Sequence, residues 1–275
     1  MQEVHPFRVI EPGYRWWNLG LRDAWSHREL LWLLMWRNVS TRYSGMALGF
    51  TWAFLEPLAL LLTLANVFPV FNRVETPYPY PIFVFAALIP WLLFTKATMD
   101  AAGCLQEHMA LISKVYFPRI LLPFASVFRD VYDSIIIIAI LIAMSIAYGH
   151  PPTWRLALLP LVLAYVTVLS LAIGLWVAGL MVEYRDLRPI ITIVMQLGFY
   201  FSPILFPPSM VPERFLFVFQ LNPMYWAIEL SRWVFLAQPV SLTAPFYIVS
   251  TAIFLGFFGG LFMFAYHEGA SVDAQ

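Results

Sequence analysis

Long apolar runs constrain the fold of this chain more than any other feature of its sequence. Of its 275 residues, 61% are hydrophobic and 12% are charged, whereas a soluble domain carries about 25% charged residues. A helix needs about 20 apolar residues to cross the hydrocarbon core of a bilayer. Six runs have or approach this length, at about 46–71, 82–104, 123–148, 156–182, 190–206 and 245–266. We therefore predict an all-α integral membrane protein with six transmembrane helices in residues 46–267. A cytoplasmic segment, 1–45, precedes them and a short cytoplasmic tail, 268–275, follows.

The lysines and arginines predict how these helices are oriented, because short cytoplasmic loops carry an excess of both. No apolar run lies near the start of the chain, so we expect no cleavable signal peptide. With the N-terminus inside, the inner segments hold Arg8, Arg15, Arg22, Arg28, Arg37, Arg42, Lys114, Arg119, Arg129, Arg185 and Arg188. The outer segments hold Arg73, Arg155, Arg214 and Arg232, and Lys96 lies within a span. Both termini are therefore expected in the cytoplasm.

The composition also argues against several functions. Basic and acidic residues balance at 16 each, which disfavours a nucleic-acid partner. One cysteine, Cys104, and five scattered histidines form no metal-binding pattern. Neither Lys96 nor Lys114 follows a glycine, so the chain has no P-loop and any ATP must bind to another subunit. No GxSxG, HExxH or obvious paired-carboxylate pattern is present, which disfavours an enzyme.

The block 27–43 is apolar, flanked by charge and too short to span a bilayer. We interpret it as a helix on the membrane surface, with Trp32 and Trp36 at the level of the lipid headgroups. Arg37 and Arg42 would then face anionic lipid or a partner protein.

Charged residues inside the apolar runs are expensive and are functional candidates by default. Lys96 and Asp100 lie four residues apart, as do Arg129 and Asp133, so each pair can neutralise itself within one helix. Such pairs serve helix packing or a transport path. Glu56 has no partner in its own run. It is expected either in a contact between helices or subunits, or as a protonated, hydrogen-bonded carboxyl.

Two connecting segments predict further helices. Residues 105–119 combine an apolar face with polar residues, and Pro118 ends the pattern. We expect an amphipathic helix there, which either docks in a groove of a soluble partner or rests on lipid headgroups. The outer stretch 207–244 contains short apolar runs between prolines. It is expected to form a pair of re-entrant or interfacial helices, or else an ordinary outer loop with aromatic anchors.

Two smaller patterns have two interpretations each. Tyr184, Arg185 and Asp186 end the fourth run on the inner side. Arg185 could clamp a phosphate, or simply pair with a neighbouring acid at the membrane boundary. The aromatic runs 52–54 and 199–201 could offer flat faces to sugar rings, or pack against lipid.

Four strings in order resemble the ABC-2 type permeases that export polysaccharides. They are RNVSTRYSGMALGFTWAFLEPL (37–58), LISKVYFPRILLP (111–123), EYRDLRPIITIVMQLGFYFSPILFP (183–207) and LNPMYWAIELSRWVFL (221–236). The matching positions include Arg42, Tyr43, Leu48, Gly49, Trp52, Pro57, Phe117, Pro118, Arg119, Pro123, Asn222, Pro223 and Arg232. One position departs from the pattern, since His108 stands where the family often has asparagine.

The resemblance implies a half-transporter in a bacterial inner membrane. Two copies would form the pathway, and two copies of a separate nucleotide-binding subunit would hold ATP and Mg²⁺, with no cofactor on this chain. The cargo would be a long glycan on polyprenyl pyrophosphate or another lipid anchor. One alternative is an ABC-2 exporter of a small amphiphile or drug, and a second is a membrane-embedded glycosyl- or acyltransferase.

The sequence and the resemblance together assign residues to five regions. Coupling to the ATPase would use a helix containing Gln106, Glu107, His108, Leu111, Lys114, Phe117, Pro118 and Arg119. The interfacial helix contributes Trp32, Trp36, Arg37, Arg42 and Tyr43. The pathway residues are Trp52, Glu56, Trp91, Lys96, Tyr200 and Phe201. Tyr184, Arg185 and Asp186 mark the inner boundary, and Asn222, Pro223, Glu229 and Arg232 the outer gate.

Overall fold

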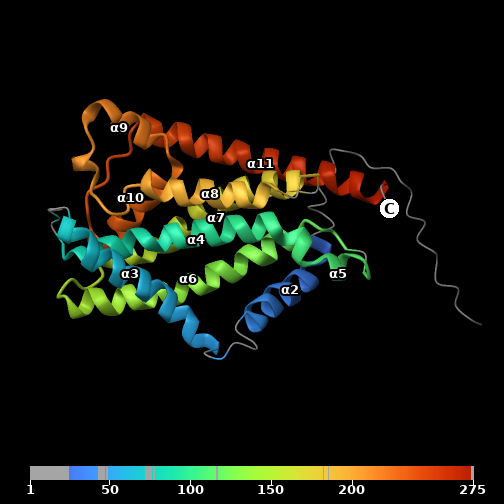
Figure 1. The fold of residues 1–275 in the computed structure, drawn as a ribbon, viewed down its shortest axis with the longest axis horizontal. Helices are drawn as coiled ribbons and strands as arrows, with labels where there is room; N and C mark the ends of the chain where they lie inside the picture. Colours follow the sequence, from blue (N-terminus) through green and yellow to red (C-terminus); the bar gives the residue numbers. More distant parts are fainter. Residues whose placement is uncertain are drawn as a thin grey trace, which may run out of the picture.

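The computed structural model describes residues 25–42, 47, 49–71, 76, 78–115, 117–181, 183–184 and 186–273. Within these residues the chain is helical and contains no strand (Figure 1). Tyr43 and Arg185, two predicted site residues, lie outside the described part.

Among the described residues, four helical segments are long and apolar enough to cross a membrane. They are α4 (Tyr80–Glu107), α6 (Leu121–Ala147), the segment Trp154–Met181 and the part Ala244–Tyr266 of α11 (Ala244–Asp273). The segment Trp154–Met181 consists of the 3₁₀ turn η2 (Trp154–Leu158) and helix α7 (Leu159–Met181). These segments agree with the predicted runs 82–104, 123–148, 156–182 and 245–266 to within a few residues, apart from the longer end of α11. The chain is therefore a multi-pass membrane protein.

The two remaining predicted spans form shorter apolar helices in the described part of the chain. The 3₁₀ turn η1 (Gly49–Thr51) leads into α3 (Trp52–Phe71), and the other span is α8 (Leu187–Tyr200). Helix α8 has 14 residues, or about 21 Å at the rise of an α-helix. The predicted helical end at residue 206 is thus wrong, because Pro203 follows Ser202, cannot donate a backbone hydrogen bond and disfavours helix at Ser202. The lengths of the helices therefore support four membrane spans in the described part of the chain, and the count of six stays a prediction.

Helix α4 lies at the centre of the bundle. Its residues 82–94 are all buried, and it contacts α3, α6, α7, α8 and α10 (Pro223–Leu236) (Figure 1). A Cβ on Gly174 of α7 would lie 2.5 Å from Cβ of Ala101 on α4, so this position tolerates only glycine at the present spacing. Helix α11 packs along α7, where a Cβ on Gly260 would lie 3.0 Å from Cβ of Leu175. Small residues let these backbones approach closely, as is typical of helix packing in membranes.

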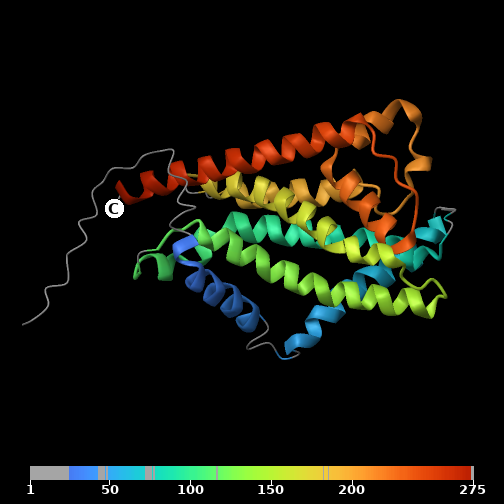
Figure 2. The ribbon, with the colours of Figure 1, turned by 180° about the vertical axis from the view of Figure 1, so that it is seen from behind.

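Helix α2 (Arg28–Thr41) covers most of the block 27–43 and packs against α6, while its position at the membrane surface stays a prediction. Leu34 and Asn38 are buried on its inner side, whereas Trp32 and Trp36 are exposed. Figure 2 shows α2 beside the bundle rather than within it.

The predicted helix over 105–119 is wrong in its extent. Helix α4 continues to Glu107, and a turn at His108 separates it from α5 (Met109–Ile112), which is only four residues long. The Nδ1 atom of His108 lies 2.9 Å from the carbonyl oxygen of Cys104, and this contact stabilises the turn that ends α4. Beyond Ile112 the described residues up to Ile120 form turns and irregular chain, and Pro118 disfavours helix at Phe117.

Residues 207–244 contain a pair of helices, as predicted, and their place relative to the membrane stays a prediction. The 3₁₀ turn η3 (Pro208–Met210) precedes α9 (Glu213–Gln220) and α10 (Pro223–Leu236). Figure 1 shows α9 and α10 at the end of the bundle opposite to α5 and the C-terminus.

Candidate functional site: a charged stripe along α4

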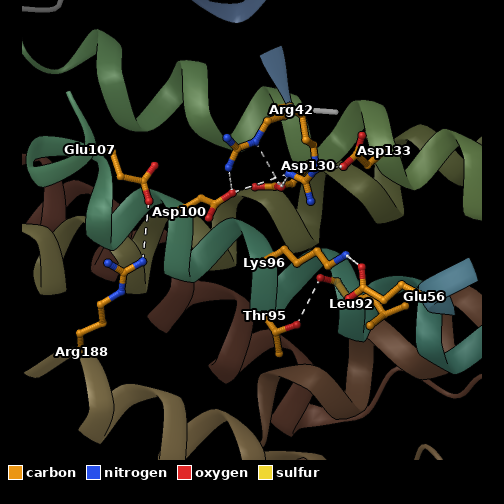
Figure 3. Close-up of polar contacts among 11 residues, drawn as sticks. Arg42, Glu56, Leu92, Thr95, Lys96, Asp100, Glu107, Asp130, Asp133 and Arg188 are labelled. Carbon is orange, nitrogen blue, oxygen red and sulfur yellow. Dashed lines mark hydrogen bonds and ion pairs between the residues drawn. The ribbon is translucent and has the colours of Figure 1, made fainter. Parts of the chain in front are cut away.

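Three charged residues, Lys96, Asp100 and Glu107, lie along one face of α4, and we call them the α4 stripe. Their spacing of four and eleven residues places them on the same side of a helix with 3.6 residues per turn. Each binds an oppositely charged residue from a different neighbouring helix (Figure 3). The stripe therefore joins α4 electrostatically to the helices around it.

Lys96 pairs with Glu56 of α3, with 2.7 Å between Nζ and Oε2. This confirms the prediction that Glu56 contacts another helix. The predicted pair of Lys96 with Asp100 is wrong, because Asp100 instead binds Arg129. Both side chains keep access to their surroundings, with 28% of Lys96 and 54% of Glu56 exposed.

Arg42, at the end of α2, points into the bundle and binds two carboxylates of α6. Its Nη1 lies 3.0 Å from Oδ1 of Asp130, and its Nε lies 2.7 Å from Oδ2 of Asp133 (Figure 3). Asp133 therefore pairs with Arg42. Its position four residues after Arg129 on α6 had suggested a pair with Arg129 instead. The prediction that Arg42 faces lipid or a partner is also wrong, because a guanidinium can satisfy two buried carboxylates at once with its fork of donors.

Around Arg42 three carboxylates share two guanidiniums. Arg129 of α6 binds Asp100 of α4, and Arg42 also approaches Asp100 at 4.0 Å. The side chain of Asp130 is 1% exposed. Removing one partner from such a buried cluster leaves an uncompensated charge, which costs about 3–5 kcal/mol.

At the C-terminal end of α4, Glu107 approaches Arg188 of α8, with 3.8 Å between Oε1 and Nη2. Both side chains are partly exposed, so this ion pair is weaker than the buried ion pairs of Arg42. A Cβ on Gly103 would lie 3.4 Å from Oε1 of Glu107, so the glycine leaves room for this contact.

Sequence reasoning placed only Arg42, Glu56, Lys96 and Glu107 of this network among the site residues. Their partners were not included: Asp100, Arg129, Asp130, Asp133 and Arg188. Their presence in or beside apolar runs was a usable signal, but sequence does not show which helices lie side by side.

The predicted coupling residues lie in the last turn of α4 and in the connection from α4 to α6. Gln106 and Lys114 are exposed, whereas Phe117 is buried. His108, Leu111, Pro118 and Arg119 are half-buried. The buried side chain of Phe117 holds the connection against the bundle, while polar side chains such as Lys114 are exposed on its surface.

The predicted pathway residues fall into two groups. Trp52 of α3, Tyr200 at the end of α8 and Phe201 just after it are exposed on this chain. Trp91 is buried instead, and its ring packs edge-on against Phe199 of α8 at 5.7 Å. Tyr184 and Asp186, at the predicted inner boundary, are exposed.

The predicted outer-gate residues hold α10 to the turn that follows α8. Asn222 caps α10 by accepting from the backbone N–H of Met224, and its Nδ2 donates to the carbonyl of Phe201. Pro223 occupies the first turn of α10, where its missing N–H has no cost.

Arg232 is fully buried in this region. It binds Glu229 at 3.2 Å, donates to the carbonyl oxygen of Ile204 at 3.0 Å and stacks 3.6 Å above the ring of Phe83. Burial lowers the pKa of its guanidinium to about 10, so it stays charged at neutral pH. Among the described residues, no group of three or more His, Cys, Asp or Glu side chains could hold a metal ion.

Similarity to known proteins extends over the residues that form these ion pairs. A family profile described as ABC-2 type transporter matches residues 29–236. The O-antigen export system permease protein RfbA of Myxococcus xanthus is 31% identical over 206 residues, which cover 74% of this chain and 79% of that protein. The protein of the same name from Klebsiella pneumoniae is 26% identical over 198 residues, covering 71% and 76%. The polysialic acid transport protein KpsM of Escherichia coli is 24% identical over 230 residues, covering 80% and 88%.

Proposed function

This chain belongs to the ABC-2 type transporter family, and on that premise we propose that it is the permease subunit of an ATP-driven polysaccharide exporter. The observation that carries the proposal is its 31% identity, over 206 residues, to a permease of an O-antigen export system. The cargo is a glycan carried on a lipid anchor, such as polyprenyl pyrophosphate, and it crosses the inner membrane of a bacterium.

The exporter contains two copies of this chain and two copies of a nucleotide-binding subunit. Neither lysine of this chain follows a glycine, so ATP and Mg²⁺ bind to the partner and this chain hydrolyses nothing. The last turn of α4, with exposed Gln106, and the connection to α6, with exposed Lys114, transmit the motion of the partner to the membrane helices.

In this arrangement each chain crosses the membrane six times, with α3 and α8 completing the four longer spans, and both termini lie in the cytoplasm. The exposed rings of Trp52, Tyr200 and Phe201 offer flat apolar contacts along which sugar rings slide. Weak contacts suit a polymer, because a tight site would stall it. Helices α9 and α10 form the outer gate.

The experiment that tests this function is deletion of the gene in its own bacterium. We expect lipid-linked glycan to accumulate on the cytoplasmic leaflet and surface glycan to disappear, with both restored by a plasmid copy. A matched strain carrying a defective glycosyltransferase should lack the accumulated intermediate. Normal surface glycan in the deletion strain would contradict the proposal.

A further inference from the structure

The Glu56–Lys96 pair differs from the other charged contacts that hold the helices together. Its distance of 2.7 Å marks a formed ion pair, yet 54% of the Glu56 side chain and 28% of the Lys96 side chain remain exposed. Asp130 and Arg232, by contrast, are almost completely enclosed by protein. The ion pair is formed, but both of its side chains remain accessible to another molecule.

Its position makes this exposure informative. Lys96 lies 11 residues before the end of α4, so it sits roughly 16 Å from the inner end of the helix. Lys96 lies within α4, which is apolar enough to span a membrane, and Glu56 lies in the apolar part of α3. Exposed charges at this depth are costly in contact with lipid tails. This surface therefore faces a polar occupant.

The chemistry of the pair narrows the kind of occupant. An ammonium group has three donors and no acceptor, and within the described part of the chain Lys96 donates to the carboxylate of Glu56. Asp100 is one turn away but is bound to Arg129 and approached by Arg42. A second anion can therefore compete only with Glu56 for Lys96.

We propose that Lys96 binds the phosphate headgroup of the lipid-linked substrate and that Glu56 is the counter-ion which this headgroup displaces. The inference rests on the proposed function and adds a site to it. A diphosphate carries more negative charge and more acceptor oxygens than a carboxylate, so it replaces Glu56 on the ammonium. When the headgroup leaves, Glu56 pairs with Lys96 again and the charge is never left bare in the membrane.

Displacement makes the two members of the pair respond in opposite directions. Glu56→Gln removes the competitor and should tighten binding of a phosphate headgroup, whereas Lys96→Gln removes the ligand and should weaken it. If the pair served only to pack the helices, both substitutions would weaken binding of the headgroup. Lys96→Arg retains the cation and should preserve binding.

The test uses the full chain in phosphatidylcholine nanodiscs with radiolabelled polyprenyl diphosphate as probe. We expect Lys96→Gln to weaken binding by about tenfold, the worth of one charge-assisted hydrogen bond, and Glu56→Gln to strengthen it. Polyprenol, which lacks phosphate, should bind equally to all variants. Inorganic pyrophosphate, which has no prenyl chain, is a second probe. If Lys96→Gln weakens its binding and Glu56→Gln strengthens it, the anion site recognises phosphate without the prenyl chain.

Several results would overturn the inference. These are equal losses in both glutamine variants, unchanged binding in both, equal binding of polyprenol and its diphosphate, or no binding of the diphosphate to the unaltered chain. None of these results touches the deletion phenotype, so the exporter function stands or fails separately. If Lys96→Gln does not fold, as seen by its thermal unfolding midpoint, the comparison of Glu56→Gln with the unaltered chain still decides the matter.

Discussion

At the scale of single residues, charge pairing across helices replaced the pairing expected within them. A spacing of four residues brings Lys96 near Asp100 and Arg129 near Asp133, but it does not exclude better partners elsewhere. In the structure Asp133 binds Arg42 and Lys96 binds Glu56. Inside a bundle the effective dielectric constant is low, so the closest opposite charge dominates whichever helix it comes from.

The first residue-scale prediction concerns Arg42. Arg42→Ala leaves Asp130 and Asp133 without their shared partner, and we expect a loss of about 3 kcal/mol in the free energy of unfolding. Adding Asp133→Asn should recover part of this loss, which a double-mutant cycle of thermal or denaturant unfolding in detergent would measure.

Arg37→Ala serves as the matched control, because Arg37 lies on the same helix and is exposed. It should change stability by less than about 0.5 kcal/mol. Additive effects of Arg42→Ala and Asp133→Asn would contradict the ion pair.

At the scale of elements, the bundle is organised by one buried helix and by small residues on its neighbours. Helix α4 is enclosed along residues 82–94, and α7 approaches it at Gly174. Lipid tails are as apolar as leucine, so close packing and not hydrophobic burial holds such helices together. The close approach at Gly174 is therefore a main source of stability for this contact.

An alanine at Gly174 tests this packing. Its Cβ would lie 2.5 Å from Cβ of Ala101 and 3.2 Å from the backbone oxygen of Thr98, so α4 and α7 must separate. We expect Gly174→Ala to lower the free energy of unfolding by about 1–3 kcal/mol.

Gly256→Ala on α11 is the matched substitution, since its Cβ would meet Cβ of Ala172 at an ordinary 3.9 Å. It should be neutral or slightly stabilising, because alanine favours helix over glycine. The two variants can be compared by their thermal unfolding midpoints in the same detergent. Equal midpoints would show that α4 and α7 are not in close contact.

At the scale of the whole molecule, the two ends of the bundle differ in kind. One end carries α9 and α10, and the other carries α5 and the C-terminal end of α11 (Figures 1 and 2). The excess of lysine and arginine at the second end predicts that it faces the cytoplasm.

Cysteine labelling checks this orientation with little background, because Cys104 is the only cysteine and is buried. Ser209→Cys, on exposed η3, should react with a membrane-impermeant maleimide in spheroplasts. Ser113→Cys, on the exposed connection after α5, should react only after permeabilisation. The unaltered chain should stay unlabelled in both conditions, and the reverse pattern would invert the proposed topology.

The sequence by itself determined the class of the protein, the place of its long helices and the absence of a P-loop. Those properties follow from runs of apolar residues and from residue types, which do not depend on partners. The predicted extents of α8 and of the 105–119 helix were wrong. In both segments an apolar run or an amphipathic pattern continues past the point at which the backbone turns.

Only the tertiary structure decided which charges meet. Arg42 lies 88 residues from Asp130 and Glu56 lies 40 residues from Lys96, and no periodic pattern relates such positions. Their pairing follows from the packing of α3 and α6 against α4 and of α2 against α6. Low dielectric inside that packing then makes each charge bind the partner that the fold brings closest.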